Sequence, residues 1–329
     1  MTRLKIGNNK EEVSIVMPMR NASTTVEKAL ASLEKQTYPI KEVIVVNDAS
    51  QDNSYDIVSN FSKKSKLPIR IITSKKRGGP GSTFNLGVGK AKSSLVILMH
   101  SDCSLPTNRE IEKLTDPIRT KASVVASFPT IFVLERIWKK YDFWEKCFFV
   151  REVGKGTAGL ATKFDCIRKD AYQKAGGFDV ENFGVGGEDA DLHERLRKIG
   201  KVTLSQARVT HLHYLGGGFT FKDFLRKKRQ YAMIYGRLLR KRPRSFLGQG
   251  IILLLKPFLA ILPFLPMVNI AGITIVILYS FLYTKKMFIT QSTLKDSRIF
   301  ILPFVNIFLL YCETFWIIES FLFGRNKLG

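Results

Sequence analysis

The chain has 329 residues, of which 45% are hydrophobic and 24% are charged, and it carries a formal net charge of +24. This length allows about two domains, and the composition is that of a folded protein, which excludes a small disulfide-stabilised scaffold and a wholly disordered chain. The four cysteines form no C-x-x-C pair. The sequence therefore predicts neither a zinc ribbon nor a secreted disulfide framework, and it fits a reducing cytoplasm.

Residues 1–218 alternate β-rich runs with helical patterns, which is typical of a parallel sheet covered by helices. Strands are expected at residues 13–19, 42–46, 68–73 and 94–99. A helix that Ser23 can cap follows the first strand, and one of its faces carries Val26, Ala29, Leu30 and Leu33. In a doubly wound sheet the ligand site lies beyond the carboxyl ends of the strands, so the polar residues that follow each strand are the candidates.

Polar residues follow the second and fourth predicted strands. Asp48 can accept hydrogen bonds from a base or a ribose, although helix capping is the favoured alternative for this stretch alone. Asp102 has His100 two residues before it, and in an extended segment both side chains would face one phosphate-bound cation. An ordinary loop is the alternative. Arg77 precedes the Gly78–Gly81 loop, which is either a plain turn or a phosphate contact.

Two acidic residues, Glu188 and Asp189, follow Gly186-Gly187 at a predicted helix start. Acidic side chains at a helix N-terminus are stabilised by the helix dipole, so capping alone would explain the pair. The alternative is catalytic, because an acceptor hydroxyl becomes a competent nucleophile when a positioned carboxylate takes its proton.

Four segments carry a family resemblance, in order along the chain. They are VSIVMPMRNASTTVEKALASLEKQTYP, EVIVVNDASQDNS, RGGPGSTFNLGVGKAKSSLVILMHSD, and AGGFDVENFGVGGEDADLHERLRKIG followed by VTHLH. Over about residues 13–213 the sequence resembles the family 2 glycosyltransferases of the GT-A fold. The resemblance implies an α/β, Rossmann-like domain that binds a nucleotide-diphosphate sugar at the strand ends, with a divalent cation, Mn²⁺ or Mg²⁺, on the diphosphate.

The resemblance also implies roles for individual residues. Asp48 and the turn from Pro18 to Asn21 would contact the nucleoside, and Arg77, His100 and Asp102 would complete the nucleotide-sugar site. Asp102 and His211 would hold the metal, with a structural imidazole as an equal alternative for His211. His100 stands where the family has a further acid, which weakens hard-cation binding and favours Mn²⁺ over Mg²⁺. Asp189 would be the catalytic base of an inverting displacement, supported by Glu188 and Asp191.

The rest of the chain predicts a membrane region. Residues 219–245 carry ten basic side chains and one acidic one, which an anionic cytoplasmic leaflet attracts. Nucleic acid is the weaker alternative, because no nucleic-acid-binding signature accompanies the charge. Residues 257–284 hold no ionisable charge, and Pro263 and Pro266 leave one helix or a hairpin open. A further span covers residues 299–323, where Glu313 and Glu319 must face a partner helix or an aqueous cavity.

We therefore expect three regions. These are a cytoplasmic GT-A domain at residues 1–218, a basic juxtamembrane segment at 219–245, and a hydrophobic region at 246–329 with two or three transmembrane helices in a multi-pass protein of the cell membrane. An aromatic stripe at 131–151 would lie either at the bilayer interface or in a core; it comprises Ile137, Tyr141, Trp144 and Phe148.

The expected function is transfer of a sugar from a nucleotide-diphosphate donor to a membrane-associated acceptor, either a polyprenyl phosphate or a lipid-linked saccharide. This activity would serve the biosynthesis of cell envelope polysaccharide or glycolipid. The alternative is a catalytically weak, nucleotide-sugar-binding membrane scaffold, against which the presence of both Glu188 and Asp189 argues.

Overall fold

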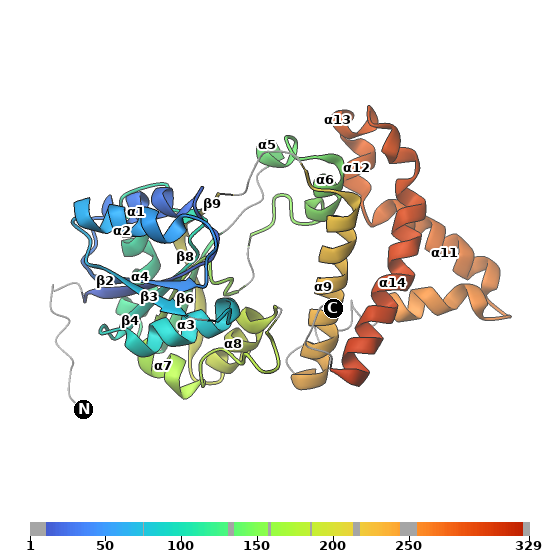
Figure 1. Ribbon diagram of the computed structural model, residues 1–329. Coiled ribbons are helices and arrows are strands. Elements are labelled where there is room, and N and C mark those ends of the chain that lie inside the picture. Colours follow the sequence, from blue (N-terminus) through green and yellow to red (C-terminus); the bar gives the residue numbers. More distant parts are fainter. Residues whose placement is uncertain are drawn as a thin grey trace. The chain divides into compact units, whose positions relative to one another are not determined.

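The computed structural model describes residues 11–74, 76–130, 135–156, 159–184, 186–212, 218–243 and 255–324 (Figure 1). The chain forms two compact units. Unit 1 comprises Met1–Ile131, Thr157–Val180 and Leu192–His213, and unit 2 comprises Phe132–Gly156, Glu181–Asp191 and Tyr214–Gly329. The borders at 218 and 246 stay predictions, and residues 246–254 of the predicted membrane region lie outside the described residues.

Unit 1 is built on a seven-stranded sheet with the order β3-β2-β1-β4-β7-β6-β8. Its strands are β1 (Val13–Met19), β2 (Ile40–Asp48), β3 (Ile69–Ser74), β4 (Leu95–Met99), β6 (Val124–Thr130), β7 (Phe164–Arg168) and β8 (Lys201–Arg208). The first four strands are parallel and overlap the predicted ranges, and β1 has the predicted bounds. The sheet as a whole is mixed, because β7 runs antiparallel to both of its neighbours.

Helices cover both faces of this sheet (Figure 1). One layer contains α1 (Val26–Glu34), α2 (Ser54–Lys64) and α4 (Glu110–Thr120); the other contains α3 (Gly79–Lys90), α7 (Lys169–Lys174) and the second half of α8 (Glu188–Arg197). The alternation of side chains along β1 explains the two layers. Ile15 and Met17 pack into the first core and Val16 into the second, so every apolar residue of this strand is buried.

The helix after β1 confirms the predicted buried face but not the predicted cap. Val26, Ala29, Leu30 and Leu33 are buried. The N-cap position is Thr25, which makes no side-chain cap hydrogen bond, so the assignment of this role to Ser23 is wrong. The Ser23 amide instead donates to Asp52 Oδ2 at 3.1 Å, because the chain makes a further turn before the helix begins.

A second, two-stranded sheet joins distant parts of unit 1. β5 (Cys103–Ser104) pairs antiparallel with β9 (Thr210–His211), and Cys103 lies opposite His211. The Leu212 amide extends this ladder by donating to the Asp102 carbonyl oxygen at 2.7 Å. The ladder therefore brings the residue pair 102 and 211 together across 109 positions of sequence.

Unit 2 has an aromatic core of its own. The predicted stripe forms two short helices, α5 (Glu135–Trp138) and α6 (Phe143–Phe149), in place of a single one. Tyr141 and Trp144 are buried in a cluster with Phe224 of α9 (Phe221–Lys241) and with Leu302 and Leu309 of α14 (Leu302–Phe323). Of the two alternatives for the stripe, core packing is therefore the one that the structure confirms.

The C-terminal part of unit 2 is helical. It contains a short helix at Leu255–Phe264, α11 (Asn269–Leu282), α12 (Lys285–Ile289), α13 (Gln291–Leu294), the 3-10 turn at Ser297–Phe300, and α14. Among the described residues, α14 is the one helix that is long and apolar enough to cross a membrane, by length and composition, and it is only partly buried. The prediction of several such helices is wrong for this part of the chain, because the break at Leu265–Val268, with Pro266 in it, divides the upstream apolar run into a hairpin.

The hairpin and α14 carry a buried ion-pair cluster. Glu313 is buried, its Oε2 pairs with Lys256 of the hairpin, and its Oε1 lies 3.8 Å from Lys228 Nζ of α9. This arrangement confirms that Glu313 faces partner helices. Glu319, one helix turn and a half further on, is half-buried.

Candidate active site

Two of the predicted carboxylates lie at one edge of the unit 1 sheet. Asp48 is the last residue of β2, and Asp102 follows the end of β4 by three residues. β1 lies between these strands and runs parallel to both. Two strand spacings separate β2 from β4, so the two chain positions are about 10 Å apart at the carboxyl edge.

Asp48 holds the loop that begins α3. Its side chain is buried, Oδ1 accepts a hydrogen bond from the Gly78 amide at 2.6 Å, and Oδ2 accepts one from the Gly79 amide at 3.0 Å. Asp48 therefore caps a helix, as the alternative interpretation had it, but the helix is α3 rather than α2. The first amide of α2 is bound by Asp52 Oδ1 at 3.1 Å instead. Arg77 is exposed beside the bound loop.

The predicted nucleoside turn begins later than expected. Pro18 still belongs to β1, where it lies opposite Val46 of β2 and beyond the last pairing of β1 with β4 at Val16. Asn21 has a φ of +48° and accepts a hydrogen bond from the Gln51 amide at 2.8 Å. Arg20 Nη1 donates to the carbonyl oxygens of Asp48 and Ala49, at 2.8 and 3.1 Å. Sequence reasoning missed Arg20, for which a cation directly after a strand was the one signal.

Asp48→Asn should weaken folding, because an amide nitrogen would face one of the two backbone donors that the carboxylate now accepts. We expect a loss of about 1.5–3 kcal/mol in the free energy of unfolding, the range for a hydrogen bond to a charged group. Urea denaturation measures it. Asp116→Asn, at an exposed position on α4, is the control and should change stability by less than about 0.5 kcal/mol. Equal effects of the two substitutions would contradict the capping role.

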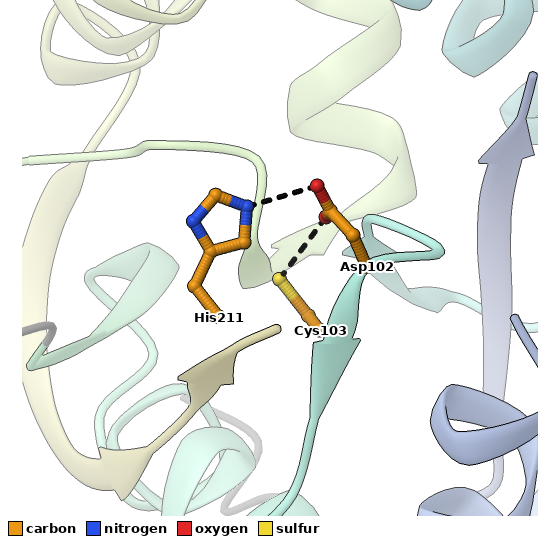
Figure 2. A group of neighbouring side chains, drawn as sticks. All are labelled: Asp102, Cys103 and His211. Carbon is orange, nitrogen blue, oxygen red and sulfur yellow. Dashed lines mark hydrogen bonds and ion pairs between the residues drawn. The ribbon is translucent and has the colours of Figure 1, made fainter. Parts of the chain in front are cut away.

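Asp102 and His211 form the centre of the candidate cation site (Figure 2). His211 Nε2 lies 2.9 Å from Asp102 Oδ2, and the Cys103 thiol donates to Asp102 Oδ1 at 3.7 Å. One ligand atom from each of the three residues lies within 4.8 Å of the others. The β5–β9 ladder explains this proximity, since it places Cys103 opposite His211.

His100 lies beside this cluster although its segment is not extended. The Cys103 amide closes a turn by donating to the His100 carbonyl oxygen, and His100 Nδ1 lies 4.0 Å from Asp102 Oδ1. Burial lowers the pKa of His100 to about 4, with help from His211 and against the effect of Asp102, so the ring is neutral at pH 7. The Thr162 hydroxyl donates to the Ala161 carbonyl and so must accept from His100 Nε2 at 2.9 Å. The lone pair on Nδ1 consequently faces Asp102.

The donor set fits a divalent cation of the Mn²⁺ type. A carboxylate from Asp102 and an imidazole from His211 are ligands that such an ion accepts. Burial raises the pKa of the Cys103 thiol far above its usual range, and thiolates suit softer metals than Mn²⁺, so we expect Cys103 to be a neighbour rather than a ligand. The neutral His100 ring is close enough to contribute a further nitrogen or to bind a ribose. His213 lies outside the described residues.

Glu188 and Asp189 belong to unit 2 and begin α8. Gly186 and Gly187 precede them with φ values of +129° and +87°, and a methyl group at either position would lie 2.6–2.7 Å from Ile234 of α9. Glycine is therefore needed here both for the backbone and for the close approach of α9. Asp189 Oδ1 accepts a hydrogen bond from the Ala190 amide at 2.8 Å. Asp191, a predicted supporting residue, is buried and bound to Arg242 Nε at 2.8 Å.

Burial raises the pKa of Glu188 to about 7, and the charge of Asp189 adds to this effect while Arg237 opposes it. In the described part of the chain, Glu188 Oε2 is a buried oxygen without a hydrogen-bond partner. Below about pH 7, Glu188 therefore keeps a proton that an ordinary carboxyl group would have lost, and a carboxyl group of this kind can act as an acid.

Glu188 should therefore contribute a decline in the stability of the protein between pH 4.5 and about 7, opposite in sign to the contribution of His100, whose pKa is lowered. In this window folded Glu188 keeps a proton that the unfolded chain, with an ordinary pKa of 4.5, has lost, so rising pH favours unfolding. Glu188→Gln should remove this part of the decline, as urea denaturation across the pH range would reveal. Glu194→Gln on the same helix is the control. Parallel pH profiles for Glu188→Gln and the unaltered chain would contradict the raised pKa.

Comparison with known proteins decides the family. The profile of "Glycosyl transferase family 2" matches residues 14–169, and that of "Glycosyl transferase family group 2" matches residues 95–317, more than half of the chain. The chain belongs to the family 2 glycosyltransferases. This assignment agrees with the strand-end carboxylates and with the GT-A type of mixed sheet described above.

Curated relatives of this glycosyltransferase match it over parts of their length. The poly(ribitol-phosphate) beta-glucosyltransferase of Bacillus spizizenii is 34% identical over 28% of this chain and 15% of its own length. Glycosyltransferase GlyG of Streptococcus pneumoniae is 30% identical over 34% of this chain and 36% of its own. The probable glycosyltransferase YdaM of Bacillus subtilis is 28% identical over 59% and 49%. The chain thus spans less than half the length of each of these relatives.

Among solved structures, the mannosyltransferase PcManGT of Pyrobaculum calidifontis, determined with GDP-Man and Mn²⁺, has the same fold. Its TM-score is 0.57 at 15% identity, and the match covers 97% of this chain and 89% of the other. At this identity the likeness shows the fold alone. It confirms the GT-A prediction.

Proposed function

We propose that this glycosyltransferase moves a sugar from a nucleotide-diphosphate donor to an acceptor held at a membrane, either a polyprenyl phosphate or a lipid-linked saccharide. The observation that carries the proposal is the Asp102–His211 pair at the carboxyl edge of the sheet, 2.9 Å apart. The related solved structure that binds GDP-Man and Mn²⁺ supports a nucleotide sugar and a divalent cation as its ligands. The poly(ribitol-phosphate) transferase among the relatives supports a cell envelope product.

The nucleotide end of the donor is assigned to unit 1. Asp48, Pro18 and Asn21 surround the β1 and β2 strand ends, where the nucleoside would bind, and Arg77 offers a cation next to the α3 amides. Asp102 and His211 would hold the divalent cation, and His100 would contact the ribose or the same ion. When bound, the cation neutralises the negative charge that develops on the departing diphosphate.

Asp189 is assigned as the base. Its carboxylate takes the proton of an acceptor hydroxyl, whose oxygen forms a bond to the anomeric carbon as the bond from that carbon to the diphosphate breaks. The bonding electrons leave with the nucleoside diphosphate, and the configuration inverts. Glu188 keeps its proton below about pH 7, which reduces the negative charge in the first turn of α8. A phosphate acceptor is already ionised, so with that acceptor Asp189 is less important.

Incubation of the purified full chain with a panel of UDP-, GDP- and other activated sugars, Mn²⁺ and a membrane lipid extract tests the proposal. We expect nucleotide release from one donor together with the transfer of labelled sugar into the lipid fraction. Release without lipid labelling would reject the membrane-held acceptor. Binding of a donor without any release would identify a catalytically weak scaffold.

A further inference from the structure

Helices α9 and α14 of unit 2 lie side by side and run in the same direction (Figure 1). The residues that contact each other have rising sequence numbers on both helices. They are Lys228 with Glu313 at 3.8 Å, the Met233 carbonyl with Ser320 Oγ at 2.7 Å, and Arg240 Nη1 with the Leu322 carbonyl at 2.9 Å. At the other end, Phe224 packs in one cluster with Leu302 and Leu309. α9 therefore accompanies α14 along nearly all of its length.

The charge of α9 does not suit the interior of a bilayer. This helix carries eight basic residues and one acidic residue, and four of the basic residues are consecutive at positions 226–229. Lys228, one of these four, lies 3.8 Å from Glu313, near the middle of the 22-residue α14, and the other three lie within one helix turn of Lys228. If α14 crossed the membrane, it would carry these cations to the centre of the hydrocarbon layer, where charged side chains are strongly disfavoured.

The opposite side of α14 is apolar and exposed. Its exposed residues recur at helical spacing along the whole helix: Phe304, Phe308, Phe315, Ile318 and Leu322. Cations and apolar side chains thus border each other along the length of α14, rather than at its two ends as in a spanning helix. At the C-terminal end, Arg240, Lys241 and Phe323 line one pocket of about 130 Å³.

The hairpin adds an uncharged tip. Met267 is 98% exposed and Ile270 is 78% exposed, and no charged residue lies between Pro257 and Thr284. The 14 residues of α11 rise about 21 Å, which is less than the roughly 30 Å of a hydrocarbon core. The hairpin can therefore enter a bilayer but not cross it.

We propose that α9 and α14 lie in the plane of one leaflet of an anionic bilayer, with the hairpin Leu255–Leu282 inserted into the same leaflet. The exposed stripe of α14 faces the acyl chains, and the exposed cations of α9, Lys222, Arg226, Arg240 and Lys241, contact the lipid phosphates. Charge complementarity selects a bilayer over a second copy of the chain, because a second copy would bring the same basic helix against this one.

Depth-dependent quenching tests the orientation. Single cysteines replace Phe304, Phe315 or Leu322 in a Cys312→Ser background, since the three other native cysteines are buried. Each single-cysteine protein is labelled with a fluorophore and bound to vesicles that contain phosphatidylglycerol. The vesicles also contain a lipid quencher placed either near the bilayer surface (shallow) or near the bilayer centre (deep). We expect the ratio of deep to shallow quenching to agree within about twofold at the three positions. A several-fold higher ratio at Phe315 alone would show that α14 spans the bilayer and would overturn the proposal.

Two controls complete the experiment. A label at Lys28→Cys, on an exposed position of α1, should not be quenched. Absence of quenching at all three α14 positions, with dimers in solution, would assign the surface to a second copy and reject the bilayer.

The side of the membrane on which each end of α14 lies gives an independent measurement. Lys295→Cys and a tag placed after Gly329 should react with impermeant reagents from the same side of sealed vesicles. Reaction from opposite sides would also overturn the proposal.

Discussion

Asp189→Asn should lower the turnover of a hydroxyl acceptor by about 10² to 10⁴, the contribution of a positioned general base. The amide cannot take the acceptor proton, but it has nearly the same shape and can still accept the Ala190 amide hydrogen bond seen at Oδ1. The affinity for the nucleotide sugar should therefore change little. Steady-state kinetics with the donor found by screening, together with calorimetric titration of the nucleotide, measures both quantities.

Glu194→Gln provides the matched control for this substitution, because it removes a carboxylate from the same helix at a position paired with Arg197. Its turnover should stay within about twofold of the unaltered enzyme. Near-normal turnover of Asp189→Asn with a hydroxyl acceptor would refute the base assignment. If the acceptor proves to be a phosphate, Asp189→Asn should have a much smaller effect, so the size of the loss also reports on the acceptor class.

Asp102→Asn should remove the Mn²⁺-dependent part of nucleotide binding. The substitution replaces the anionic ligand of the candidate cation site with a neutral one, while His211 and His100 keep their places on β9 and on the turn after β4. We expect the nucleotide to bind 10- to 100-fold more weakly in the presence of Mn²⁺, the range found for changes around metal sites. Without Mn²⁺, the Asp102→Asn variant and the unaltered enzyme should bind the nucleotide with the same affinity. Calorimetric titration with and without Mn²⁺ measures both affinities.

Cys103→Ser tests whether Cys103 binds the cation or only lies beside the residues that do. The thiol lies 3.7 Å from Asp102 Oδ1, and thiolates suit softer metals than Mn²⁺, so its replacement by a hydroxyl should leave Mn²⁺-dependent binding within about twofold. A loss as large as that of Asp102→Asn would make Cys103 a metal ligand. Unchanged affinity of Asp102→Asn with and without Mn²⁺ would remove the metal assignment altogether.

The parallel half of the sheet could be predicted because its signals are local. Runs such as residues 13–19 and 94–99 are continuously apolar, and buried strands flanked by helices have this pattern. The hairpin was one of two open alternatives, and Pro263 and Pro266 supplied the local reason for it. The helix cap at Ser23 failed because several polar residues compete within one turn, and tertiary contacts such as that of Ser23 with Asp52 decide among them.

Other features depend on partners that are remote in sequence. Asp48 looked like a cap for the helix that follows it, but its acceptors are filled by Gly78 and Gly79, which only the sheet brings near. The number of membrane helices was overestimated because the break at Leu265–Val268 divides the upstream apolar run into two helices that are too short to span. The roles of Asp189 and Glu188 came from the family resemblance, and the raised pKa of Glu188 gives that pair a physical basis.

The two-residue ladder between β5 and β9 has a consequence for how the enzyme matures. His211 reaches Asp102 only through this ladder, so a nascent chain that has emerged from the ribosome as far as β8 holds a nearly complete sheet without its cation site. β8 ends one residue before β9 begins, so the pairing of β8 with β6 holds the chain directly before this point, and the ladder then places His211 opposite Cys103. The candidate cation site should thus be one of the last features of unit 1 that the newborn polypeptide completes.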